Sequence, residues 1–258
     1  MKISVITTID DASLPLFLLI NNKNVFIDFI LLNENIKTII SKIKKNNPDY
    51  IYIRDPFNST LDVNSSIKKL EYIMDNFNWQ YIDNISGIDD FLFEDKFIQY
   101  KKYSKFMPKT MLLSQYNNNY KNYIVKKRIS SKAKWIFFDI NEIDWNKDDY
   151  IIQERIKAEK EYRIYVLKNY IIPVWLIKTT KTSTTKVLVK DKTDIPFELN
   201  KFIKDIIKWN KFDLIWLDII YSGNKYYLLE INRSPQFKKF FKLTSINLAE
   251  ELINSYLN

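Results

Sequence analysis

Hydrophobic and polar positions in the first part of the chain predict strands interleaved with helices. Short runs rich in Ile, Val, Phe and Tyr predict strands at residues 2–8, 25–32 and 49–54. Apolar residues at helical spacing predict helices at 35–46 and 65–76. Asn64 or Ser65 is the expected cap of the second helix. This alternation predicts a small α/β unit with a boundary near residue 94.

The remainder of the chain is predicted to be richer in strands. A helix is expected from Asp95 to about Phe106, before Pro108 begins an extended segment. Five strands are expected after it, at 122–127, 134–139, 150–156, 161–167 and 170–178. The last predicted elements are a helix at 198–209, a hairpin of 213–221 and 225–232, and a helix at 244–257. With a softer boundary near 157, we expect three segments: 1–94, 95–157 and 158–258.

Three side chains that carry oxygen ligands are expected on one face of the predicted hairpin. Glu230 and Asn232 share a face because side chains alternate along a strand. A loop of odd length brings Asp218 to that face, and a loop centred on Asn224 places it opposite Glu230. These oxygens suit magnesium. Alternatively, Asp218 and Glu230 are outward polar residues of a half-buried strand, although a charge within an apolar run is costly unless paired or metal-bound.

The composition excludes several classes of chemistry. The chain has no histidine and no cysteine, so catalytic triads with histidine, His-ligated zinc, thiol catalysis and disulfides are impossible. It has two glycines, Gly87 and Gly223, whereas a P-loop or a dinucleotide fingerprint needs several within one turn. A bound metal must therefore be held by Asp, Glu and Asn oxygens, which again favours magnesium.

The net charge of +9 allows a nucleic-acid-binding protein as an alternative function. The lysines are spread along the chain, and the aromatic residues fall mostly in apolar alternation, which is typical of a core. We therefore expect a solvated basic surface, compatible with ATP or an acidic peptide, and nucleic acid as an unlikely partner. No apolar run approaches the roughly 18–20 residues that span a bilayer, so a soluble, cytoplasmic protein without a membrane partner is expected.

The second half of the hairpin resembles a known signature. Segment 228–235 (LLEINRSP) resembles the "LEVN-x-SPG" segment of ATP-grasp enzymes, with Asp218 where that family places its first magnesium ligand. Segment 244–249 (TSINLA) extends the similarity to the RimK-type ligases. The resemblance implies an ATP-grasp fold of the mixed α/β (α+β) class. It also implies a pre-ATP-grasp domain (1–94), a central subdomain (95–157) and a C-terminal subdomain with the metal site (158–258).

Three cationic side chains match positions that face phosphates in this family. Lys126, in a segment that resembles "VVKP", would contact the α- and β-phosphates of ATP. Lys96, in a "DK…P-x-T" segment, would be a second phosphate lysine. Arg163 resembles the arginine of the "D-x-R" variant, which faces phosphate or substrate. The resemblance makes Arg163 and Lys126 the candidate catalytic residues. Taken singly, the lysines could be surface residues and Arg163 an ion-pair partner.

The nucleoside of ATP has its own expected contacts. The segment Gln153, Glu154, Arg155 and Ile156 resembles the "QEYI" hinge, in which backbone groups of Arg155 and Ile156 would read the adenine edge. Glu161 falls where the family places its ribose-binding carboxylate. Singly, these glutamates could be exposed strand residues.

The chain departs from the family pattern near the substrate. The phosphate-covering loop, 130–135, lacks glycine, and 178–186 replaces a Gly-rich stretch. Trp216 stands where several relatives carry arginine, and Gln236 replaces the glycine after Ser-Pro. We interpret these changes as a divergent substrate, because the acidic metal ligands are retained.

The expected function is an ATP-dependent carboxylate–amine ligase that uses Mg²⁺ and forms an acyl-phosphate. The RimK-type similarity favours a peptide or protein substrate, for amino-acid addition or side-chain cross-linking. A non-catalytic ATP-binding protein is the other alternative, and an oligomer is possible. Arg54, at a strand end, either faces the acceptor substrate or caps its loop.

Overall fold

The computed structural model describes most of the chain and divides it into two compact units. The described residues are 1–57, 62–117, 122–130, 135–143, 146–168, 170–178, 189–190 and 195–257. Unit 1 comprises Met1–Phe91, Lys211–Leu214 and Ser234–Asn258, and unit 2 comprises Leu92–Asn210 and Ile215–Arg233. The C-terminal segment thus returns to the N-terminal unit. None of the helices in the described ranges is long and apolar enough to cross a membrane.

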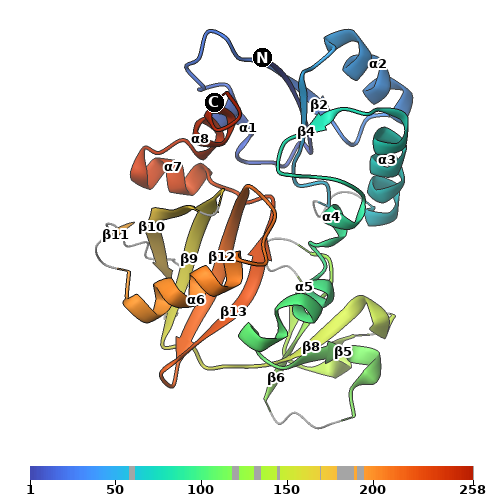
Figure 1. The fold of residues 1–258 in the computed structure, drawn as a ribbon. Coiled ribbons are helices and arrows are strands. Elements are labelled where there is room, and N and C mark those ends of the chain that lie inside the picture. Colours follow the sequence, from blue (N-terminus) through green and yellow to red (C-terminus); the bar gives the residue numbers. More distant parts are fainter. Residues whose placement is uncertain are drawn as a thin grey trace. The chain divides into compact units, whose positions relative to one another are not determined.

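Unit 1 contains the α/β arrangement that the alternation predicts. Its four-stranded sheet is parallel, in the order β2-β1-β3-β4 (Figure 1). The strands are β1 (Lys2–Thr7), β2 (Phe26–Leu31), β3 (Tyr50–Ile53) and β4 (Gln80–Tyr81). Apolar residues of β1 and β3 are buried, as expected for a parallel sheet covered by helices. The short strand β4 was not predicted.

Several helices of unit 1 begin at a polar cap whose side chain accepts a backbone hydrogen bond. They are α1 (Leu14–Phe17), α2 (Ile36–Asn46), α3 (Val63–Asn76), α4 (Asp89–Leu92, at the unit boundary), α7 (Lys238–Thr244) and α8 (Leu248–Asn254). The cap of α3 is Asp62, whose carboxylate accepts bonds from the backbone of Asn64 and Ser65, so the prediction that one of these two residues is the cap was wrong.

The closing helix predicted at 244–257 is shorter in the structure, where α8 begins at Leu248, and α7 before it was not predicted. Ser245 ends α7 in the left-handed region (φ 59°), which an α-helix cannot continue through. Asn247 then caps α8 by accepting a bond from the backbone N–H of Ala249. The break comes from capping geometry at polar residues that an apolar periodicity does not register.

Arg54 is a structural residue of unit 1. Its side chain is fully buried and bonds the carboxylate of Asp11, with Nε 2.9 Å from Oδ2. It also donates to the hydroxyl of Tyr52 at 3.1 Å and to the carbonyl of Pro235 at 3.0 Å. A fully buried guanidinium cannot face an acceptor substrate, so that alternative was wrong. Arg54 instead joins the end of β3 to the segment after the hairpin.

Unit 2 contains two sheets. The four-stranded sheet has the order β5-β8-β6-β7 and antiparallel pairs. Its strands are β5 (Thr110–Leu112), β6 (Tyr123–Lys127), β7 (Ile136–Phe137) and β8 (Tyr150–Glu154). Short 3-10 turns flank them, at Ser104–Phe106, Leu113–Gln115, Ile140–Glu142 and Lys147–Asp149. One apolar cluster forms its core, made of Leu113, Val125, Ile143, Tyr150 and Ile152.

The second sheet of unit 2 carries the predicted hairpin. Its order is β11-β10-β9-β12-β13, so among the strands of the described residues β13 lies at the edge of the sheet. The strands are β9 (Lys160–Leu167), β10 (Tyr170–Lys178), β11 (Val189–Lys190), β12 (Leu214–Ser222) and β13 (Lys225–Asn232). The helices of this unit are α5 (Lys96–Tyr103) and α6 (Phe197–Ile207). Buried residues of α6 recur at helical spacing, as its amphipathic pattern predicts.

Candidate active site

The hairpin of β12 and β13 pairs Asp218 with Glu230 as predicted, but its loop differs from the predicted one. Its loop has two residues, Gly223 (φ 55°) and Asn224 (φ 62°), between the paired Ser222 and Lys225. Two positive φ angles are typical of a type I′ turn, which matches the twist of a hairpin. The prediction of an odd loop was therefore wrong.

A β-bulge compensates for the even loop. The register shifts between Ile219, which pairs with Leu228, and Asp218, which pairs with Glu230. Leu229 is the extra residue on β13, and one extra residue reverses the face of every side chain beyond it. Asp218 and Glu230 are opposite each other, as predicted.

Asp218 is held by Arg163 of β9. The guanidinium donates from Nε to Oδ1 and from Nη2 to Oδ2, both at 2.8 Å. The Cζ atom of Arg163 lies 3.6 Å from the ring centroid of Trp216, two residues before Asp218. Bidentate pairing and stacking fix the planar group more rigidly than an ammonium could be fixed. Arg163 thus lies beside a candidate metal ligand.

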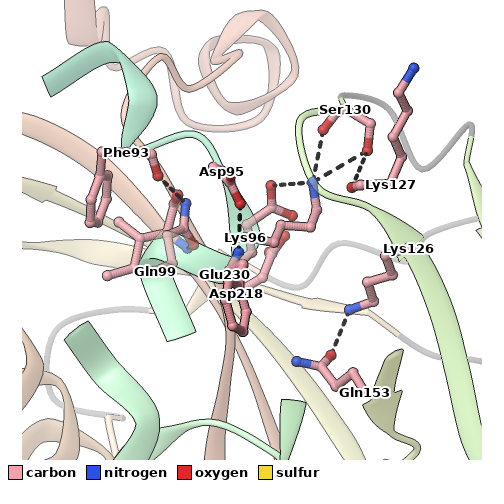
Figure 2. A network of polar contacts seen from close by, with 12 residues as sticks. Phe93, Asp95, Lys96, Gln99, Lys126, Lys127, Ser130, Gln153, Asp218 and Glu230 are labelled. Atoms are coloured by element: carbon pink, nitrogen blue, oxygen red, sulfur yellow. Dashed lines mark hydrogen bonds and ion pairs between the residues drawn. The ribbon is translucent and has the colours of Figure 1, made fainter. Parts of the chain in front are cut away.

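Glu230 is approached by Lys96, the first residue of α5. The ammonium of Lys96 is 3.7 Å from Oε1 of Glu230 and donates to the carbonyl and hydroxyl oxygens of Ser130 at 3.0 and 3.3 Å (Figure 2). Asp95 caps the helix and accepts two bonds from Arg128, which follows β6. Lys96 therefore connects the candidate metal site to the segment expected to cover phosphates.

Lys126 of β6 is a buried lysine in the same neighbourhood. Its ammonium donates to Oε1 of Gln153 on β8 at 2.8 Å, and Gln153 donates to the hydroxyl of Thr110 at 2.9 Å. Burial lowers the pKa of Lys126 to about 8; Lys96 adds to this decrease, and the carboxylates of Glu230 and Asp218 partly oppose it. All four charged groups are therefore electrostatically coupled.

Arg155, Ile156 and Glu161, three of the residues predicted to hold the nucleoside, line one cavity of about 470 Å³, whereas Gln153 and Glu154 do not line it. Its lining comprises Asn122, Arg155, Ile156, Lys157, Ala158 and Glu161. The backbone N–H of Arg155 donates to the carbonyl of Asn122, and its carbonyl accepts from the Asn122 side chain, both at 3.1 Å. Glu154 donates its backbone N–H to the carbonyl of Lys109 at 2.8 Å. The cavity thus joins the predicted hinge to Glu161.

The donor set fits a hard divalent cation. Asp218, Glu230 and Asn232 supply carboxylate and amide oxygens on one face of the hairpin, the ligand types that magnesium prefers. No group of three or more carboxylates gathers within the described part of the chain, so the third donor would be the amide of Asn232. Arg163 and Lys96 now neutralise the two carboxylates.

Sequence reasoning missed several residues around these groups. Gln99, Asn122 and the pair of Asp95 and Arg128 all contact segments distant in the sequence. Gln99 had a weak signal, since it lies three residues after Lys96 and hence on the same helix face. The predicted loop residues 131–134 and the stretch 179–186 lie outside the described residues.

Two kinds of comparison relate this chain to known proteins. Residues 112–256, more than half of the chain, match the sequence family described as the RimK-like ATP-grasp domain. No curated protein sequence matches the chain significantly.

Solved structures share the fold at low sequence identity. An ATP complex of D-alanine–D-alanine ligase from Bacillus anthracis aligns with a TM-score of 0.68 at 18% identity, covering 98% of this chain and 95% of that one. The ATP-grasp ligase PsnB with a minimal precursor aligns with 0.63 at 12%, covering 98% and 97%. N5-carboxyaminoimidazole ribonucleotide synthetase from Thermotoga maritima aligns with 0.70 at 12%, covering 100% and 76%. The mixed α/β class and the ATP-grasp fold predicted from the sequence are confirmed.

Proposed function

Because the chain belongs to the RimK-like ATP-grasp family, we propose that it is an ATP-dependent carboxylate–amine ligase acting through an acyl-phosphate. The observation that carries this proposal is the pairing of Asp218 with Glu230 within reach of Arg163 and Lys96. The three predicted segments, 1–94, 95–157 and 158–258, would be its pre-ATP-grasp domain, central subdomain and C-terminal subdomain.

The residues of the site divide the work of binding ATP. Ile156 and the hinge from Gln153 to Arg155 would contact adenine, and Glu161 would bind the ribose in the same cavity. Since Asn122 already bonds both backbone groups of Arg155, the backbone of Ile156 is the better candidate for the adenine edge. Lys96 and Lys126 would bind the phosphates. Asp218, Glu230 and Asn232 would hold Mg²⁺, which neutralises phosphate charge when bound.

The reaction requires little covalent participation by the protein. An oxygen of the substrate carboxylate attacks the γ-phosphorus, the bond from that phosphorus to ADP breaks, and ADP leaves. The amine nitrogen then attacks the acyl carbon, phosphate leaves, and the nitrogen loses a proton to give the amide. Both steps depend on positioning and charge neutralisation, which Lys96, Lys126 and Arg163 would supply.

A peptide is the substrate class that we favour. PsnB, a structural neighbour, was solved with a precursor peptide, and the net charge of +9 suits an acidic peptide. The product would carry either an added amino acid or a side-chain cross-link. D-alanine–D-alanine ligase, another neighbour, keeps a small amino acid as the competing substrate class.

Substrate-dependent ADP release tests the proposed function. With Mg²⁺, ATP and a pool of amino acids, we expect release to rise when short acidic peptides are added, and mass spectrometry to find a peptide that has lost one water or gained one residue. Amino acids alone, including D-alanine, form the comparison arm. ATP binding without release in any arm would favour a non-catalytic ATP-binding protein, and no ATP binding would contradict the proposal.

The lowered pKa of Lys126 predicts a pH dependence of ATP binding. The ammonium binds phosphate, and it loses its proton as the pH rises through about 8, so affinity must fall with rising pH. We expect the Kd for ATP to increase by up to about tenfold per pH unit between about pH 8 and about pH 9, measured by calorimetry. Lys126→Met should bind ATP more weakly at neutral pH and lack this slope. Lys127→Met, the neighbour on the opposite face of β6, should keep it; a flat wild-type profile would contradict the prediction.

A further inference from the structure

Gln99 is a buried side chain whose amide is hydrogen-bonded at both its nitrogen and its oxygen. Its Nε2 group donates to the carbonyl oxygen of Phe93 at 2.9 Å (Figure 2). The same group donates to the carbonyl oxygen of Ile231 at 2.7 Å. Its Oε1 atom accepts from the backbone N–H of Ile231 at 2.9 Å. Turning the amide over would oppose oxygen to two carbonyl oxygens, so these contacts define one orientation.

The contact with Ile231 occupies the outer edge of the sheet. In the strand order β13 has a neighbour on one side, and the outer groups of an edge strand lack a strand to pair with. Gln99 takes both the N–H and the C=O of Ile231, as a neighbouring strand would. Backbone groups alternate sides along a strand, so those of Glu230 and Asn232 point toward β12.

Ile231 lies between two of the candidate metal ligands. Its side chain is fully buried, whereas Glu230 and Asn232 project to the opposite face. The bulge at Leu229 interrupts the ladder immediately before Glu230, and a bulge loosens the local pairing. The bonds from Gln99 therefore fix the strand where its own ladder is weakened.

The helix that carries Gln99 also carries Lys96. Residues three apart lie on the same face of a helix, and the Lys96 ammonium is 3.7 Å from Glu230. An apolar residue at position 99 could fill the space beneath the strand. Only a side chain with both a donor and an acceptor can also hydrogen-bond the N–H and the C=O of Ile231 and so fix the position and orientation of its peptide groups.

We propose that Gln99 is a positioning residue of the metal site. The hydrogen bonds from its side-chain amide to the backbone of Ile231 hold the side chains of Glu230 and Asn232 in position to bind Mg²⁺. This inference rests on the proposed function, because it takes Glu230 and Asn232 as the ligands. It assigns no contact between Gln99 and the metal or ATP.

The test compares nucleotide binding with and without metal in Gln99→Met. Calorimetry measures ADP affinity in EDTA and along a Mg²⁺ titration. We expect affinity in EDTA within about threefold of wild type and a ten- to hundredfold higher Mg²⁺ concentration for half-maximal tightening, an effect of about the size found for outer-shell partners of metal ligands. Lys101→Met, at an exposed position of the same helix, should match wild type in both.

Two further measurements do not depend on the folding of that variant. Gln99→Glu keeps the acceptor for the Ile231 N–H but loses the donors, and it should also raise the Mg²⁺ requirement. In the wild type, hydrogen exchange should find the Ile231 amide strongly protected despite its place on an edge strand.

Each contrary outcome has a distinct meaning. An unchanged Mg²⁺ requirement, an equal loss of ADP affinity with and without metal, or rapid exchange at Ile231 would overturn the positioning role and leave the proposed function standing. If wild-type ADP binding itself ignores Mg²⁺, the metal assignment fails, and the inference fails with it.

Discussion

Replacing Glu230 by Gln should lower substrate-dependent ADP release by at least about a hundredfold while the protein stays folded. The substitution keeps the size of the side chain and removes one of the two opposed carboxylate charges on the hairpin. Half of the anionic charge available to Mg²⁺ is then lost, and Lys96 loses the anion 3.7 Å from its ammonium. Steady-state ADP release at saturating ATP, Mg²⁺ and substrate measures the effect.

Two companion variants make this result specific. Asp218→Asn should cause a loss of similar size, because it removes the other carboxylate and half of the bidentate contact with Arg163. Glu198→Gln, at an exposed position of α6, should leave activity within about twofold of wild type, as expected for a solvated residue. Retained turnover in Glu230→Gln would remove Glu230 from the metal site.

The hairpin shows how far an alternating pattern predicts a site. Alternation correctly placed Asp218 opposite Glu230, but it assumed one uninterrupted register. The structure instead combines a two-residue turn with a bulge at Leu229. The even loop and the extra residue each shift the register, and together they restore the pairing of Asp218 with Glu230. A bulge depends on packing on both faces of the sheet, so neither strand alone encodes it.

Long-range polar contacts were the least predictable part of the fold. Apolar periodicity correctly predicted β1, α2 and most later strands, because the residues that form one buried face of an element recur at a regular spacing within a short segment. Gln99 and Arg54 each bond a backbone group more than a hundred residues away, on Ile231 and Pro235 respectively. Such contacts arise only when the topology is complete, and no local pattern specifies them.

The buried pair of Arg54 and Asp11 should make the largest contribution of any polar contact to the stability of unit 1. Both side chains are fully buried, and Asp11 also accepts bonds from Thr7 and Ser13, each at 3.0 Å. Burial raises the pKa of Asp11, but the Arg54 guanidinium and the hydrogen bonds from Ser13 and Thr7 together outweigh burial and hold it below its ordinary value. The carboxylate is therefore charged at neutral pH.

Arg54→Met should lower the free energy of unfolding of unit 1 by about 3–5 kcal/mol, since it leaves a buried charge without its partner. The methionine side chain would pack against the aromatic rings that now surround the guanidinium. The centroids of these rings, of Phe17, Tyr52 and Phe237, lie 5.0–5.5 Å from the guanidinium carbon. Hydrogen exchange of the β1 and β3 amides in increasing urea measures the loss within this unit. Adding Asp11→Asn removes the stranded charge, so the double variant should recover at least about 1 kcal/mol relative to Arg54→Met. A loss below about 1 kcal/mol in the single variant would contradict this account, because it would equal that of an exposed ion pair.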